Sequence, residues 1–133
     1  MAGTTLNVGD GNNVVSIAAN ATGAATVSAG AGNDTLWYNE NVTYLDNSGS
    51  NTLGIDGTFT AASVSANLAG LTYGTVSMSA NATSVDLTGV TDGKAIVVGA
   101  KATTVVGGSG DDTVQIAAGS ISSDKVIDGG AGS

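Results

Sequence analysis

The chain has 133 residues, of which 41% are apolar and 21 are glycine. This is the length of one domain, and the shortage of large side chains implies a thin core. The net charge of −8, with three lysines, no arginine and no histidine, argues against binding to nucleic acid or anionic membranes, because little basic charge is available for phosphates. Without cysteine or histidine, neither disulfides, nor a His-based triad, nor a protease-type zinc site can form. We therefore expect no enzyme activity.

The first part of the chain, residues 1–56, contains three copies of one pattern, in which a short strand, a six-residue turn and a second strand follow each other. The turns are V-G-D-G-N-N at 8–13, A-G-A-G-N-D at 29–34 and D-N-S-G-S-N at 46–51. The predicted strands are 4–7, 14–17, 25–28, 35–38, 42–45 and 52–55. The turns recur about every 20 residues, and such a period is typical of a solenoid.

In the middle part, residues 57–102, the glycine pattern fades although the period persists. Alternating apolar and small polar residues predict half-buried strands at 63–67, 75–80, 84–87 and 95–98. The turns at 66–71 and 87–92 fall in register but have no glycine at their fourth position. We therefore expect these coils to stack without metal.

The last part, residues 103–133, returns to the glycine pattern. A strand at 103–106 leads into GGSGDDTVQ, residues Gly107 to Gln115. A turn at 117–123 and a strand at 124–127 precede G-G-A-G-S, which begins another copy of the pattern at Gly129. Because this copy stops after its first positions, we expect the chain to be either a piece of a longer protein or a subunit whose end is completed by a neighbour.

The turns themselves predict a cation site. Glycine can adopt the positive φ angles that direct successive carbonyl oxygens to one point, and an aspartate such as Asp34 or Asp112 adds a carboxylate. Ca²⁺ takes about six to eight oxygen ligands, which is more than one turn can supply. Two turns stacked about 4.8 Å apart could complete the shell. We expect Gly11, Gly32 and Gly49 to lie along one edge, and Gly110 to lie beside Gly132.

GGSGDDTVQ fits the nonapeptide G-G-x-G-x-D-x-U-x, in which U is a large aliphatic residue, at every specified position. In this motif the chain resembles the RTX family of secreted bacterial proteins, whose nonapeptides form a calcium-bound parallel β-roll. With the repeat, the resemblance implies an all-β, right-handed parallel β-solenoid of about six to seven coils over residues 1–133. The expected Ca²⁺ ligands are Gly107, Ser109, Gly110, Asp111, Asp112, Gly129, Ala131, Ala29, Ala31, Asn33, Asp34, Val8, Asp10, Asn12, Asn13, Asp46, Ser48 and Asn51.

The mixture of calcium turns with plain coils is most similar to the lattice-forming part of a type I-secreted surface-layer protein. That likeness implies a structural, extracellular role at a bacterial cell surface, with calcium driving folding and self-association, and it leaves a cell-surface polysaccharide open as a further partner. The alternative is a calcium-triggered folding and secretion module of an enzyme, toxin or adhesin. A simpler explanation of the turns also stays open, in which the Asp and Asn side chains only cap their own bends.

Overall fold

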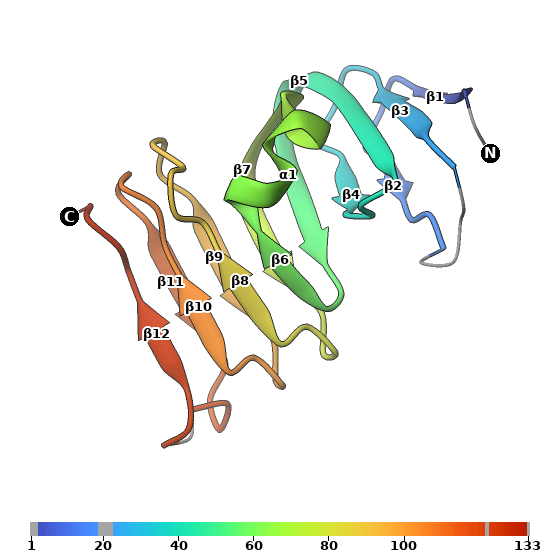
Figure 1. Cartoon of the computed structure of the whole chain (residues 1–133). Coiled ribbons are helices and arrows are strands. Elements are labelled where there is room, and N and C mark those ends of the chain that lie inside the picture. The colour runs from blue at the N-terminus through green and yellow to red at the C-terminus, as the bar shows by residue number, and fades with distance from the viewer. Residues whose placement is uncertain (1–2, 19–22, 122, 133) are drawn as a thin grey trace. The chain divides into compact units, whose positions relative to one another are not determined.

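The computed structural model describes residues 3–18, 23–121 and 123–132, and it is built almost entirely of parallel β-strands (Figure 1). The strands stack as a β-solenoid of about six turns. This confirms the predicted all-β solenoid. By their internal contacts the residues fall into two compact units: the N-terminal unit, Met1–Leu53 with Val64–Tyr73, and the C-terminal unit, Gly54–Ser63 with Gly74–Ser133.

The N-terminal unit contains the strands of the first three coils. They are β1 (Thr4–Gly9), β2 (Val14–Val15), β3 (Ala25–Ala29), β4 (Thr35–Trp37) and most of β5 (Val42–Ile55). Strand β3 pairs in parallel with β1 and with the first part of β5, and β4 pairs with β2 and β5. Each coil therefore adds one strand segment to each side of the unit, as the repeated strand, turn and strand predict.

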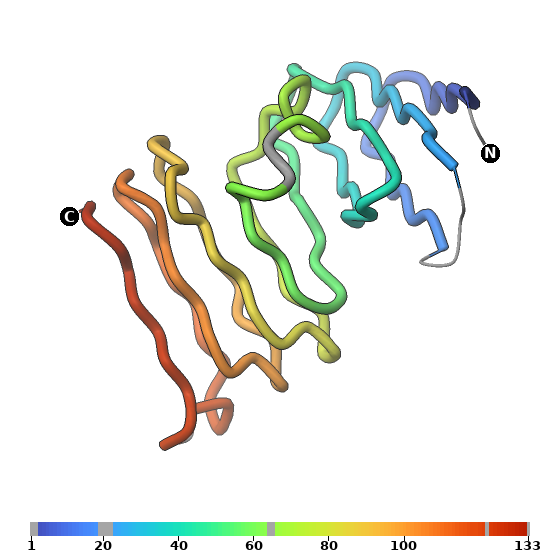
Figure 2. The backbone as a smooth tube through the Cα atoms, viewed as in Figure 1, coloured from blue at the N-terminus to red at the C-terminus, as the bar shows by residue number. Residues whose placement is uncertain are grey.

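The C-terminal unit has two parallel layers, and its strands alternate between them along the chain. One layer is β6 (Thr58–Thr60), β8 (Ser84–Asp86), β10 (Thr104–Val106) and β12 (Val126–Asp128). The other contains the later part of β7 (Gly70–Met78) with β9 (Ala95–Val98) and β11 (Thr113–Ile116). The backbone tube in Figure 2 can be followed from one layer to the other in each coil.

The core of each unit is a column of apolar side chains, aliphatic and aromatic, that repeats from coil to coil. In the N-terminal unit the fully buried Val27 pairs with the fully buried Tyr44 of the next coil. In the C-terminal unit Phe59, Val85 and Val105 are aligned across β6, β8 and β10 and are all buried. Because strand side chains alternate between faces, the small polar residues between these positions point away from the core.

The predicted strand at 63–67 is wrong: this segment lies in a helix, α1 (Ala61–Leu68). Alanine is the best helix former, and the segment AASVSANL contains three alanines and a leucine. The Asn67 side-chain amide also donates to the carbonyls of Glu40 (3.0 Å) and Val42 (2.9 Å), which holds the end of the helix in place. The turn predicted at 66–71 is therefore replaced by the helix end and the start of β7.

The third coil also differs from the prediction. The two strands expected at 42–45 and 52–55 are one continuous strand, β5, which runs through D-N-S-G-S-N. This turn retains only Gly49, whose φ is +75°, so the chain bends at one residue instead of forming a six-residue loop. The other predicted strands agree with the structure to within two residues at their ends, except that β7 begins at Gly70, five residues before the start of the strand predicted at 75–80.

Candidate inter-coil cation site

The candidate site lies in the turns that join the two strands of each coil, because these turns are stacked within each unit. A Cβ added to Gly32 would collide with the carbonyl of Gly11, and one added to Gly49 would collide with the carbonyl of Gly32. Likewise, a Cβ on Gly132 would collide with the carbonyl of Gly110. The predicted glycine edge and the predicted proximity of Gly110 and Gly132 are thus confirmed.

Side chains at the fifth position of each turn form a ladder between coils of the N-terminal unit. The side-chain oxygen of Asn12 accepts a hydrogen bond from the Asn33 backbone N–H (2.8 Å). That of Asn33 accepts one from the Ser50 N–H (2.8 Å). At the third position of the turns, Asp10 Oδ1 likewise accepts a hydrogen bond from the Ala31 N–H (3.0 Å). These side chains bind the backbone of the next coil, so their role extends beyond capping their own bends.

A second ladder runs through the sixth position of each turn, with the opposite polarity. The backbone N–H of Asn13 donates to Asp34 Oδ1 (2.7 Å), and the N–H of Asp34 donates to the side-chain oxygen of Asn51 (2.9 Å). The amides of Asn13 and Asn51 also donate to carbonyls of their own turns, Gly9 (2.9 Å) and Ser48 (2.9 Å). Asn13 and Asn51 therefore combine local capping with contact between coils.

Asp34 and Asp46 form the most unusual pair of this stack. Both are buried, with 1% and 4% of their surface exposed, and the Oδ2 atom of each is buried without a hydrogen-bond partner. The two carboxyl groups lie within hydrogen-bonding reach of each other. Burial raises the pKa of Asp46, the Ser48 N–H lowers it, and the Asp34 carboxylate raises it. Two acceptor groups thus face each other with no donor between them, so the pair needs a proton or a cation.

The atoms around this pair fit a hard cation. Ser48 Oγ lies 2.9 Å from the Gly30 carbonyl and 3.3 Å from Asp46 Oδ1, and the Ser48 N–H donates to the same Oδ1 (3.1 Å). The neighbourhood therefore offers carboxylate, carbonyl and hydroxyl oxygens, which are the ligands that Ca²⁺ prefers. Among the described residues, no point gathers three or more Asp, Glu, His or Cys side chains, so backbone oxygens would have to complete the ligand shell.

The turn of the complete nonapeptide is different, because its aspartate is fully hydrogen bonded. Asp112 Oδ1 accepts the Lys94 N–H (2.7 Å), and Oδ2 accepts the Gly108 N–H (2.7 Å). Asp111 beside it is exposed. In this turn the carboxylate both caps its own bend and holds the preceding coil.

The remaining predicted ligand positions contribute backbone contacts to the stack. In the C-terminal unit the N–H groups of Gly107, Ser109 and Ala131 donate to carbonyls of neighbouring coils, and Gly129 is exposed. In the N-terminal unit Val8 lies in β1, and Ala29 pairs with Gly9. The Ala31 carbonyl accepts the Gly11 N–H (2.7 Å). The residues expected to supply carbonyl ligands thus lie at the stacked edge.

Sequence reasoning missed Lys94, which occupies the sixth position of its turn. The Lys94 N–H bonds Asp112 Oδ1 in the same way that Asn13 bonds Asp34. The turn in register is therefore 89–94, two residues later than the 87–92 expected. Counting back from strand β9 would have found it, because the sixth residue of such a turn immediately precedes the second strand where the two strands are separate, as Asp112 precedes β11.

No family model, no curated protein and no solved structure matches this chain. In the part of the chain that the structure describes, no helix is long and apolar enough to cross a membrane.

Proposed function

We propose that this chain is a structural, calcium-binding segment of an extracellular surface-layer or filament-forming protein, in which calcium drives folding and assembly. The observation that carries the proposal is the pair of buried, facing carboxyl groups of Asp34 and Asp46, each with an unpartnered oxygen. Their role in this proposal is to hold a calcium ion between the second and third coils of the N-terminal unit.

The charge balance of the N-terminal unit supports an external cation. The sequence of this unit contains Asp10, Asp34, Glu40 and Asp46 but no lysine, arginine or histidine. Removing a charge from water without compensation costs several kcal/mol, of the order of 5. Since no side chain of the unit can supply a positive charge, the compensation has to come from a proton held by the pair or from a bound metal ion, and we propose that calcium supplies it.

The oxygen ligands favour calcium over softer metals, because zinc and copper select sulfur or imidazole donors and this chain has neither cysteine nor histidine. Extracellular calcium modules bind with dissociation constants of about 10⁻⁴ to 10⁻³ M. An ion that binds the folded state alone adds its binding energy to folding. A site of this affinity would be filled outside the cell and empty inside it, so folding would follow export.

Self-association is the second part of the proposal. Val14 (73% exposed) in the N-terminal unit, and Ile121 (71%) and Val126 (59%) in the C-terminal unit, place large apolar side chains in solvent. Parallel strands with free edges are templates for pairing with another chain. We infer that contacts of this kind join copies into a lattice or filament once calcium has ordered the coils.

The test begins with isothermal titration of the metal-free chain with CaCl₂ and, separately, MgCl₂. We expect calcium binding with a dissociation constant of about 10⁻⁴ to 10⁻³ M and a matching increase in the β-sheet circular dichroism signal. No heat and no spectral change up to about 10 mM calcium, ten times the weakest expected constant, would reject the calcium proposal.

Electron microscopy and light scattering in calcium test the assembly. Ordered sheets or fibres are the expected result, and EDTA should dissolve them. A folded, calcium-bound monomer would instead favour the alternative, a folding and secretion module of a type I-secreted enzyme, toxin or adhesin.

A further inference from the structure

Lys94 occupies a place in the C-terminal unit that corresponds to the carboxylate site of the N-terminal unit. Its N–H donates to Asp112 Oδ1 (2.7 Å) across 18 residues of sequence. This is the same sixth-position ladder in which the N–H of Asp34 donates to Asn51. In register, Lys94 therefore corresponds to Asp34 and Asn13, and a cationic side chain stands where the other unit has an acid or an amide.

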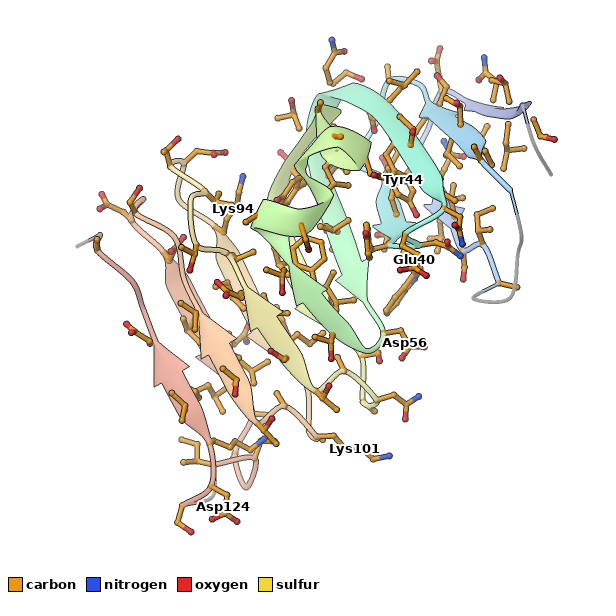
Figure 3. All side chains as sticks on the ribbon, viewed as in Figure 1. Glu40, Tyr44, Asp56, Lys94, Lys101 and Asp124 are labelled. Carbon is orange, nitrogen blue, oxygen red and sulfur yellow. The ribbon has the colours of Figure 1, made fainter. Side chains whose placement is uncertain are left out.

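The Lys94 side chain is buried as well as charged. Only 4% of the residue is exposed, and its Nζ forms an ion pair with Asp92 of the same turn, whose side chain is 73% exposed. Figure 3 labels Lys94 at the turn that precedes β9. Lysine is almost never fully buried without a partner, because its ammonium group must be compensated by oxygen atoms. The turn therefore supplies the Asp92 carboxylate as a partner for a buried positive charge.

A second lysine places its ammonium group on the neighbouring coil, away from the glycine turns. Lys125 Nζ donates to the carbonyls of Ala100 (3.0 Å) and Ala102 (2.6 Å), which lie in the preceding coil. All three lysines of the sequence, Lys94, Lys101 and Lys125, belong to the C-terminal unit. Two of them thus place an ammonium group on oxygen atoms of a turn, as a bound cation would.

We propose that Lys94 is a built-in cation that replaces an inter-coil metal ion, so that the coils of β8 to β11 are ordered without calcium. Lys125 supports the same coils at their other turn. The N-terminal unit has no such lysine and depends on a bound ion. The comparison between units rests on the proposed calcium function, whereas the role of Lys94 in metal-free protein does not.

The test is peptide-resolved hydrogen–deuterium exchange of the full chain in EDTA and in calcium. In wild type, peptides from β8 to β11 should be protected in EDTA and change less than about twofold on adding calcium. Peptides from β3 to β5 should gain protection of about tenfold or more, which is the change for 1.4 kcal/mol of site stabilisation. Protection of β8 to β11 that requires calcium in wild type would overturn the proposal.

Lys94→Gln removes the charge and keeps a polar side chain of similar reach, and Lys94→Arg is the matched control that keeps the charge. In EDTA we expect Lys94→Gln to lose at least tenfold protection in β8 to β11, and calcium to restore it, while Lys94→Arg stays within about threefold of wild type. Unchanged protection in Lys94→Gln, or a loss that calcium does not restore, would overturn the replacement of a metal by lysine.

Lys94→Asp provides a second variant, because it places a carboxylate at the sixth position, as in the turn of Asp34. We expect this variant to make the protection of β8 to β11 dependent on calcium. Equal protection in EDTA and calcium would contradict the proposal. If calcium changes no peptide of β3 to β5 in wild type, the calcium function fails, and the EDTA comparison of Lys94→Gln with Lys94→Arg still decides the role of the lysine.

Discussion

Replacing Asp46 by Asn should have opposite effects on stability in the absence and in the presence of calcium. In metal-free protein, burial and the nearby Asp34 carboxylate raise the pKa of Asp46, so ionising it in the folded state costs free energy. An asparagine removes this cost, and its oxygen can still accept the Ser48 N–H. In calcium, the same change removes a charged ligand. Asp46→Asn should therefore stabilise the N-terminal unit in EDTA and abolish most of its response to calcium.

The size of both effects can be estimated. Two unit charges about 4 Å apart repel each other by about 4 kcal/mol at an effective dielectric constant of about 20. A proton shared by the pair relieves part of this repulsion, so we expect Asp46→Asn to stabilise the metal-free unit by about 1 to 3 kcal/mol. For wild type, about 10 mM calcium and a dissociation constant of about 10⁻³ to 10⁻⁴ M give about 1.4 to 2.7 kcal/mol of stabilisation.

Urea denaturation followed by tryptophan fluorescence measures the free energy of unfolding of the N-terminal unit, because Trp37 is the single tryptophan of the sequence and lies in β4 of that unit. The matched control is Glu40→Gln, which removes the same charge from an exposed position of the same unit. Two results would refute the reasoning. One is an Asp46→Asn variant that is less stable than wild type in EDTA, and the other is one that keeps the full calcium response.

Three further predictions concern the turns. In metal-free protein, the raised pKa of Asp46 means that the folded state binds this proton more tightly than the unfolded chain does. The stability reported by Trp37 should therefore fall as the pH rises from 3.8, the ordinary pKa of the group, through its raised pKa. A pH titration in which Asp46→Asn keeps the slope of wild type would contradict this. Asp112→Ala leaves two N–H groups without their hydrogen-bond acceptor. It should reduce the exchange protection of β9 to β11 by about 1 to 3 kcal/mol per group, in EDTA and in calcium alike. A loss of protection that is seen only in calcium would contradict this. Gly32→Ala would place a Cβ against the Gly11 carbonyl, whereas Gly11, which also has a positive φ, has open space where a Cβ would stand. Gly32→Ala should therefore lower the urea midpoint by more than Gly11→Ala does. Equal midpoints would contradict the close stacking of the turns.

The stacking of the turns could be predicted because it depends on a period and on glycine. A repeat of about 20 residues brings the same turn position of successive coils together, and a close approach of backbones excludes a Cβ. This is why Gly110 and Gly132 could be placed side by side from their spacing. The sixth-position ladder follows from the same register, since the sixth residue of a turn either precedes a strand that pairs with its neighbours or, as Asn51 does in β5, lies within one.

Other features depend on interactions that the period does not encode. Helix α1 follows from its alanines and from the hydrogen bonds of Asn67 to another coil, and an alternation of small residues does not distinguish it from a strand. The closeness of Asp34 and Asp46 also escaped prediction. They occupy the sixth position of one turn and the first position of the next. They meet because the third turn has a carboxylate at its first position, where the other two turns of the unit have Val8 and Ala29.

The residues of the sixth-position ladder show why one solenoid would compensate its buried polar and charged groups in several ways. Asn13 and Asn51 are neutral and satisfy the neighbouring backbone with amide groups. Asp112 is ionisable, but both of its oxygens accept N–H groups. Lys94 carries its own positive charge, whereas Asp34 has one N–H partner and one orphaned oxygen. Since an uncompensated buried charge is costly, the residue at this position should decide, coil by coil, whether an ion is required. Exchanging Asp34 for Asn should then remove the calcium requirement of its coil, just as Lys94→Asp should create one.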